Sequence, residues 1–156
     1  MMKAPLALLA TVLREQLARL GVACDDHALL EGVANAQRER CKTLREMAQN
    51  SLYFFSDFDA YDDKAASKHL NAQSLPLLDQ LSAGLRELSD WNAAGVHSVI
   101  AAVAERAGAG LGKVAQPLRV AMSGGAVSPP IDLTVALVGR ERALARLQRA
   151  AGYVGR

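Results

Sequence analysis

Four cations stand close together in the segment RERCKTLR, and their side chains are well suited to binding an anion or a base. Arg38, Lys42 and Arg45 are spaced i, i+4 and i+7, which places them on one face if the helix is continuous, and Arg40 lies opposite. Arginine presents a planar fork of donors that matches phosphate oxygens and base edges. The alternative interpretation of this spacing is an ordinary solvated helix surface.

A second candidate site is the triplet Ser128-Pro129-Pro130, which precedes Ile131. Serine can cap free backbone N–H groups and proline is tolerated in a first turn, so the triplet predicts a sharp helix start. The N–H groups of a helix start can receive a phosphate or a base edge. Nearby arginines that could hold phosphates are Arg119, Arg140, Arg142 and Arg146. For Arg119 and Arg146, internal ion pairs with Glu141 or Asp132 remain an open alternative.

The charge of the chain is unevenly distributed. A net charge of +2 is made up of +1 in residues 1–55, −4 in residues 56–90 and +5 in residues 91–156. Such asymmetry suits a protein that touches a polyanion with one face, although solvated helix faces produce the same pattern.

The composition predicts the architecture that must position these residues. The chain has 156 residues, of which 51% are apolar but only 4% aromatic, and Ala and Leu supply most of the apolar total. This composition favours helices over strands. We expect an all-α fold of about eight helices without a sheet, in two small subdomains, residues 1–90 and 91–156, with Trp91 at their joint.

Caps and leucine spacing predict where the helices lie. A leucine stripe indicates a helix over residues 4–20, and Asp25 or Asp26 can cap a second helix that reaches at least Arg40. The capping box Thr43-Leu44-Arg45-Glu46 predicts a break near residues 41–42 and a new helix over 44–55. Further helices are expected over about 62–70, 72–88, 92–107, 113–122 and 131–139, with one more after Gly139.

Two motifs have a structural and a functional interpretation. The aromatic cluster at residues 53–55 could stack on unpaired bases, but aromatics at a helix end are more typical of a core. The glycine-rich AGAGLGK at residues 107–113 imitates a phosphate-binding loop. No strand precedes it and the required spacing is absent, so a connection between helices is expected.

Several blocks of the sequence resemble the C-terminal segment of bacterial glutamyl-tRNA synthetases. LRVAMSGG, SPPI and LVGRERALARL follow that family's pattern LR-x-A-x-(T/S)-G, S/T-P and L-x-G-(K/R)-E-x-x-L-x-R-L, and RERCKTLREMAQNSLYFF resembles its R-E-R-x-K-T-L-x-E segment. Both blocks occur in the family's order, so the resemblance covers nearly the whole chain. It implies an all-α cage that grips the anticodon loop of a tRNA.

The resemblance also implies residue roles. The family reads the third anticodon base, a cytosine, with an arginine of the first block, which corresponds here to Arg40 or, as second choice, Arg38. Its threonine-proline-x-leucine helix start corresponds to Ser128, Pro129 and Ile131. Serine keeps the hydroxyl of threonine, whereas Pro130 and Ile131 stand where the family often has Gly and Leu, so the apolar fit to a base can differ.

Catalytic signatures are missing from the sequence. It contains neither an HIGH-like nor a KMSKS-like motif, the two that a class I synthetase uses to bind ATP, and no nucleophile, zinc or paired-carboxylate pattern. We expect no cofactor here, with ATP and Mg²⁺ confined to a separate catalytic domain of a glutamate–tRNA ligase. The rival hypotheses are a helical protein-interaction module and a small unrecognised enzyme.

The N-terminal sequence and the two cysteines indicate where in the cell the protein is expected. The apolar run after Lys3 ends at Arg14 and Glu15 without a cleavage site, so a signal peptide is not expected. The two cysteines lack metal-ligand spacing. We expect a cytoplasmic monomer that binds the anticodon loop of tRNA(Glu) and no membrane.

Overall fold

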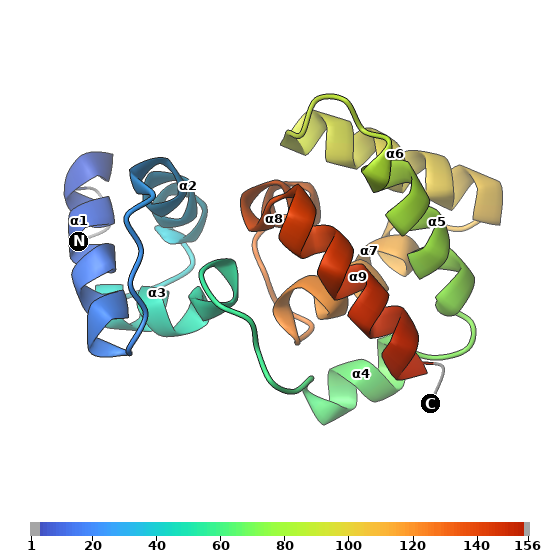
Figure 1. Ribbon diagram of the computed structural model, residues 1–156, viewed down its shortest axis with the longest axis horizontal. Coiled ribbons are helices and arrows are strands. Elements are labelled where there is room, and N and C mark those ends of the chain that lie inside the picture. Colours follow the sequence, from blue (N-terminus) through green and yellow to red (C-terminus); the bar gives the residue numbers. More distant parts are fainter. Residues whose placement is uncertain (1–3, 155–156) are drawn as a thin grey trace. The chain divides into compact units, whose positions relative to one another are not determined.

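The computed structural model describes residues 4–154, and within this range it contains nine α-helices, one 3₁₀ helix and no strand (Figure 1). This confirms the predicted all-α fold. Residues 1–3 and 155–156, and with them the charge of Lys3, lie outside the described residues. The helices are α1 (Leu6–Arg19), α2 (His27–Gln37), α3 (Leu44–Asn50), the 3₁₀ helix η1 (Leu52–Phe54), α4 (Asp63–His69), α5 (Leu75–Arg86), α6 (Ala93–Ala107), α7 (Leu111–Ser123), α8 (Ile131–Val138) and α9 (Arg140–Val154).

The chain forms two compact units, Met1–Asp57 and Phe58–Arg156, which we call unit 1 and unit 2. Sequence reasoning places a boundary at residues 90–91 instead. In the structure, α5 and α6 lie on either side of that position and pack against each other within unit 2. A division of binding roles at residues 90–91 stays a prediction.

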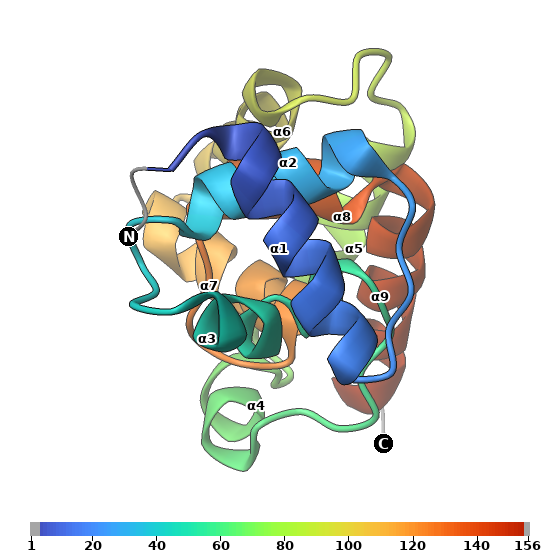
Figure 2. The ribbon, with the colours of Figure 1, turned by 90° about the vertical axis from the view of Figure 1, so that its left-hand side faces the viewer.

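Unit 1 is a three-helix arrangement in which α1 packs against both α2 and α3 (Figure 2). The predicted leucine stripe of α1 forms its core, since Leu9, Leu13 and Leu17 are almost fully buried. The Asp26 side chain accepts a hydrogen bond from the Leu29 amide at 3.1 Å, which caps α2 as expected.

The helix boundary in the middle of unit 1 differs from the prediction. Helix α2 ends at Gln37 and does not reach Arg40, because the amides of Arg40 and Cys41 both turn back to the Gln37 carbonyl. A fresh helix starts at Leu44, where the Glu46 amide donates to the Thr43 hydroxyl at 3.0 Å. The capping box is confirmed in part: the Glu46 carboxylate accepts from the Lys42 amide instead of closing back on Thr43.

Unit 2 is built around α5 and α9, which pack against each other, with α6, α7 and α8 completing the core (Figure 1). Helix α6 is capped by the Asn92 side chain and ends at Gly108, whose φ of 63° suits a glycine. Gly139 separates α8 from α9 as expected. The unit's fully buried side chains include Leu78, Leu81, Leu85, Leu118, Met122 and Leu147.

The first residues of unit 2 are held by its last helix. Arg149 donates to the backbone carbonyls of Phe58 and Asp59, and its guanidinium lies over the Phe58 ring, 4.9 Å from the centroid. Gly124 lies against the same ring, where a Cβ atom would come within 3.1 Å of it. We call the contacts of Arg149 and Gly124 with Phe58 the Phe58 clamp. In unit 1, by contrast, the Ser56 amide still donates to the Leu52 carbonyl.

Candidate nucleic-acid interface

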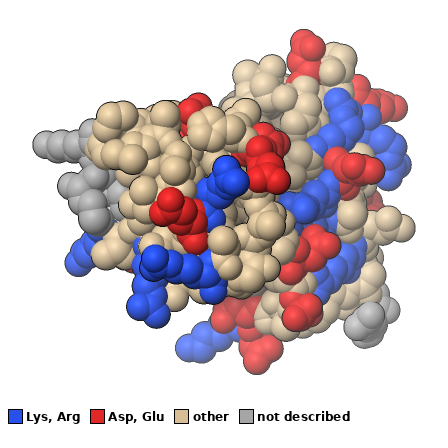
Figure 3. Space-filling view, turned by 60° about the vertical axis from the view of Figure 1, so that its left-hand side comes forward, with Lys and Arg blue, Asp and Glu red and all other residues tan. Residues whose placement is uncertain are grey.

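The candidate cations of unit 1 lie around the junction of α2 and α3: Arg38 follows the last residue of α2, Arg40 and Lys42 lie on the turn, and Arg45 lies in the first turn of α3. Arg40, Lys42 and Arg45 are exposed, while Arg38 is half-buried. Because the helix is interrupted here, the condition for one continuous cationic face is not met. The four cations nevertheless lie close together along the chain, within residues 38–45. Figure 3 shows Lys and Arg side chains standing out from the surface, with Asp and Glu among them.

Two buried side chains with polar contacts hold the turn between α2 and α3 in place. Cys41 is 5% exposed, and its sulfur accepts a hydrogen bond from the Asn50 amide. Gln37, 3% exposed, donates to the Ser51 hydroxyl at 3.2 Å. Burial raises the pKa of the Cys41 thiol, although the Asn50 contact opposes this, so the side chain is a neutral anchor. The exposed Arg40 and Lys42 therefore lie on a turn that these buried contacts hold in place.

Arg38 and Arg40 have different surroundings. The Arg38 guanidinium donates to the Ala4 carbonyl at 2.6 Å, which ties the end of α2 to the residues before α1. Arg40 projects from the turn and is exposed. Which of the two side chains reads a base stays a prediction.

In unit 2, the start of α8 is organised by a small polar network. The Ser128 hydroxyl accepts a hydrogen bond from Arg119 Nε at 2.9 Å, and Thr134 donates to the Pro129 carbonyl at 2.9 Å. Pro129 is buried and Ile131 half-buried. The structure thus brings Arg119 and Ser128 together, and the phosphate role assigned to Arg119 must coexist with this contact.

The role of Ser128 as a helix cap is wrong. The residue before α8 is Pro130, which has no side-chain donor or acceptor and cannot cap the helix. Ser128 lies too early because two prolines separate it from Ile131. Within the first turn the Leu133 amide donates to the Asp132 carboxylate at 2.9 Å, which leaves the amides of Ile131 and Asp132 for a ligand.

Arg140 is engaged inside unit 2. Its guanidinium donates to the Leu85 and Arg86 carbonyls at 3.3 and 3.2 Å and to that of Leu88, so it caps the end of α5. It also lies over the Trp91 ring, 5.1 Å from the centroid. A cation at a helix C-terminus is stabilising, so these contacts explain its position without a ligand.

The other arginines of α9 also face the protein to different degrees. Arg146 is 3% exposed and donates to the Met122 carbonyl at 2.6 Å, with its guanidinium over the Phe58 ring. Its side chain is therefore directed into the protein, because the carbonyl that accepts from it lies on α7. Arg142 is half-buried on the same helix.

Several organising residues escaped the sequence analysis. Gln37 is buried, and nothing in its spacing signals this. Thr134 is also buried, and its position five residues after Pro129 is the one sequence signal for the hydroxyl bond to the Pro129 carbonyl. The aromatic Phe54 is fully buried, which confirms a core role for that ring.

Two searches of the described residues bear on other functions. In residues 4–154, no group of three or more His, Cys, Asp or Glu side chains is placed to hold a metal ion. Within the same range, none of the helices combines the length and the apolar character needed to cross a membrane.

Comparison with known proteins assigns the family. Residues 7–151 match the family model described as "Anticodon binding domain". The chain is 44% identical over 155 residues to glutamate–tRNA ligase 1 of Alkalilimnicola ehrlichii and 46% identical over 138 residues to glutamate–tRNA ligase 2 of Halorhodospira halophila. It covers 99% and 88% of its own length in these matches, but only 33% and 29% of the relatives.

A solved structure supports the same fold. The crystal structure of a glutamate tRNA ligase from Elizabethkingia meningosepticum in complex with its amino acid matches with a TM-score of 0.89 at 22% identity, over 97% of this chain and 30% of the other. The matched family is a binding domain, and the matched stretch is a minor part of each ligase. The chain therefore belongs to the anticodon binding domain family, and its relatives of known name are glutamate–tRNA ligases.

Proposed function

We propose that the chain binds the anticodon loop of tRNA(Glu), as the anticodon-binding part of a glutamate–tRNA ligase. The observation that carries this proposal is the exposed Arg40 on a turn whose base is fixed by Cys41 and Gln37, within a chain of the anticodon binding domain family. ATP, Mg²⁺ and glutamate would be handled by a separate catalytic domain of the ligase, in the cytoplasm.

The two candidate sites would do different work on the RNA. Single-stranded loops are read on the edges of splayed bases, and their phosphates are held by cations. Arg40 would donate to the third anticodon base, with Lys42 and Arg45 placed to hold neighbouring phosphates. The Ile131 and Asp132 amides at the start of α8 would donate to another base, against the half-buried Ile131 side chain.

The experiment that tests the proposal is binding of the chain to a fluorescent anticodon stem-loop of tRNA(Glu) and to the same hairpin with its third anticodon base changed. We expect the change to weaken binding by about 1–3 kcal/mol. Arg40→Ala should abolish this difference. Arg19→Ala is the matched control, because it removes an exposed arginine from the same unit, in the last turn of α1.

Salt distinguishes the proposal from a protein-interaction module. Phosphate contacts release counterions, so RNA binding should weaken steeply as salt rises. Equal binding of both hairpins by the native chain and by Arg40→Ala would contradict the role of Arg40. Binding of a protein partner that resists salt, with no RNA binding at all, would favour the alternative function.

A further inference from the structure

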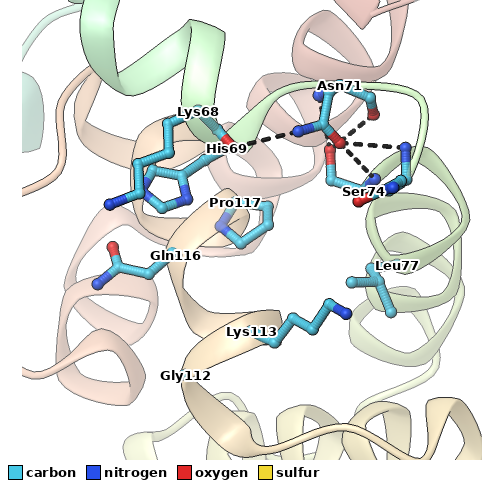
Figure 4. Close-up of a pocket in the computed structure, with 10 residues that line it drawn as sticks. Lys68, His69, Asn71, Ser74, Leu77, Gly112, Lys113, Gln116 and Pro117 are labelled. Carbon is cyan, nitrogen blue, oxygen red and sulfur yellow. Dashed lines mark hydrogen bonds between the residues drawn. The ribbon is translucent and has the colours of Figure 1, made fainter.

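A groove runs along one side of α5 in unit 2 and consists of three hollows of about 200, 400 and 220 Å³. The first lies between the end of α4, the turn after it and the first half of α7 (Figure 4). It shares Gln73, Leu77 and Lys113 with the second, which in turn shares Gln80 with the third, between α5 and α6. The hollows are therefore parts of one surface, which we call the α5 groove.

The floor of the α5 groove is apolar. Leu77, Pro117 and Val103 line it and are buried. The glycine-rich connection before α7 contributes Gly112, where an added Cβ atom would meet no neighbouring group within 4 Å. Along α5 the lining spans residues 74–84, which is about 15 Å at the rise of an α-helix. An extended chain covers that length with about five residues.

Positive charge is distributed along the rim of the groove. Lys68 lies at the first hollow, Lys113 at the first and second, and Arg106 at the third. In Figure 4, Lys113 extends from α7 toward Leu77, whereas Lys68 lies beside His69 at the other end of the first hollow. All three cations are exposed, and none of them pairs with a carboxylate of residues 4–154.

Negative charge is missing from the lining. No Asp or Glu of the described residues lines any of the three hollows, although residues 56–90 carry a net charge of −4. The groove thus combines an apolar floor with cations that have no partner in the described chain. Its complement is a ligand that carries both carboxylates and apolar side chains.

The aromatic content of the groove favours a peptide over RNA. Sites for single-stranded RNA combine cations with several aromatic side chains, on which successive bases stack. Among the described residues, the only aromatic ring in the lining is that of His69, at one end. Burial lowers the pKa of His69, so this ring adds no positive charge at neutral pH.

We propose that the α5 groove binds an extended acidic segment of a second protein. Apolar side chains of this segment occupy the hollows, against Leu77 and Val103, and its carboxylates pair with the three rim cations. Exposed ion pairs are individually weak, so the apolar side chains supply most of the affinity and the charges supply specificity. The groove shares no residue with the candidate anticodon sites, so this proposal does not depend on anticodon recognition.

The test is fluorescence anisotropy of the full chain with a labelled peptide of about eight residues that alternates Leu and Glu, which is long enough to span the groove. A peptide that alternates Leu and Lys is the charge control. We expect the Glu peptide to bind and the Lys peptide to remain free. Absence of binding by the Glu peptide, or equal binding of both peptides, would overturn the proposal.

The rim cations provide the charge test within the chain. Lys68→Ala, Lys113→Ala and Arg106→Ala should each weaken binding of the Glu peptide about two- to fivefold, as expected for one exposed ion pair. Lys64→Ala is the matched control, since Lys64 is exposed on α4 and lines none of the hollows. An equal loss with Lys64→Ala would reduce the binding to unspecific charge attraction and contradict a defined groove.

Gly112→Phe tests the hollow itself. The new ring narrows the first hollow, so binding should weaken about tenfold or more, the value of one leucine side chain that is no longer buried. Gly152→Phe is the matched control, because it adds the same ring on α9, also where a Cβ atom meets no neighbouring group and outside the groove. Circular dichroism checks that both variants are folded. An equal effect of the two substitutions would refute binding in the groove.

Competition separates this proposal from an RNA site. A single-stranded RNA without the anticodon sequence should leave the Glu peptide bound. Displacement of the peptide by this RNA, with RNA binding weakened by the same rim substitutions, would assign the groove to RNA and overturn the proposal. The hairpin comparison that tests the proposed function changes no residue of the groove, so failure of either proposal is seen independently of the other.

Discussion

The cations at the junction of α2 and α3 in unit 1 and the arginines of α9 in unit 2 have different surroundings. Between the end of α2 and the first turn of α3, Arg40, Lys42 and Arg45 are exposed, in a segment whose net charge is close to zero. In the C-terminal third, which carries +5, Arg140, Arg146 and Arg149 all donate to backbone carbonyls of their own unit. The net charge of a segment is therefore a poor measure of the cations that it offers to RNA.

The largest effect on this comparison is expected from a substitution of Arg146. Arg146→Met keeps much of the side-chain volume but removes the buried donation to Met122 and the contact with Phe58. We expect the free energy of unfolding of unit 2 to fall by about 2–4 kcal/mol, because a buried carbonyl loses its partner. Chemical denaturation followed by Trp91 fluorescence reports on unit 2. An unchanged midpoint would show that the inward contact is dispensable.

Arg140 should give the next largest effect. Arg140→Ala exposes the end of α5 and removes the guanidinium from the Trp91 ring, so unit 2 should lose about 1–3 kcal/mol of stability. Arg106→Ala is a control, since Arg106 is an exposed arginine near the end of α6. Stem-loop affinity measured below the unfolding transition should stay unchanged. A large loss of affinity in folded protein would instead assign Arg140 to the phosphate role.

Arg38 and Arg40 allow the comparison to be sharpened within unit 1. Arg38→Ala should lower the stability of unit 1 by about 1 kcal/mol, because the Ala4 carbonyl loses a half-exposed donor. Discrimination of the third anticodon base should persist in this variant. Thermal unfolding together with the paired hairpins separates the two effects. If discrimination disappears while stability holds, Arg38 is the reader and the order of the two candidates is reversed.

Lys42 should give the smallest effect. Lys42→Ala leaves the backbone amide that pairs with Glu46 in place, so unit 1 should keep its stability. Affinity should fall similarly for both hairpins, and the slope of log affinity against log salt should decrease by about 1. Fluorescence titrations at four salt concentrations measure that slope. An unaltered slope would remove Lys42 from the phosphate contacts.

Local features of the fold were readable from the sequence because their signals are local. Asp26 and Gly139 mark helix ends with their own side chain or backbone freedom, and the structure confirms both. The end of α2 at Gln37 could not be predicted from the sequence, because it depends on the burial of the Cys41 and Gln37 side chains. Residue spacing within one sequence does not show such burial.

The candidate site divides in the same way. The positions of Arg40 and Ile131 followed from the motifs, whereas the partners of Arg119, Arg140 and Arg146 lie 9 to 55 residues away along the chain. Helical periodicity describes one helix alone, so it could not show that Arg146 is buried. The packing of α7 against α9 decides which polar residue that helix turns inward.

The contacts of Phe58 with Arg149 and Gly124 decide where a chimera between two related proteins is best joined. Because Ser56 is bonded into unit 1 and Phe58 into unit 2, Asp57 is the natural crossover point for a chimera. A graft joined at Ala60 would combine position 58 of one parent with Arg149 and Gly124 of the other, so these contacts would depend on a match between the two parents. A junction at Asp57 carries the clamp across intact, so domain shuffling in this family should tolerate splices there far better than three residues later.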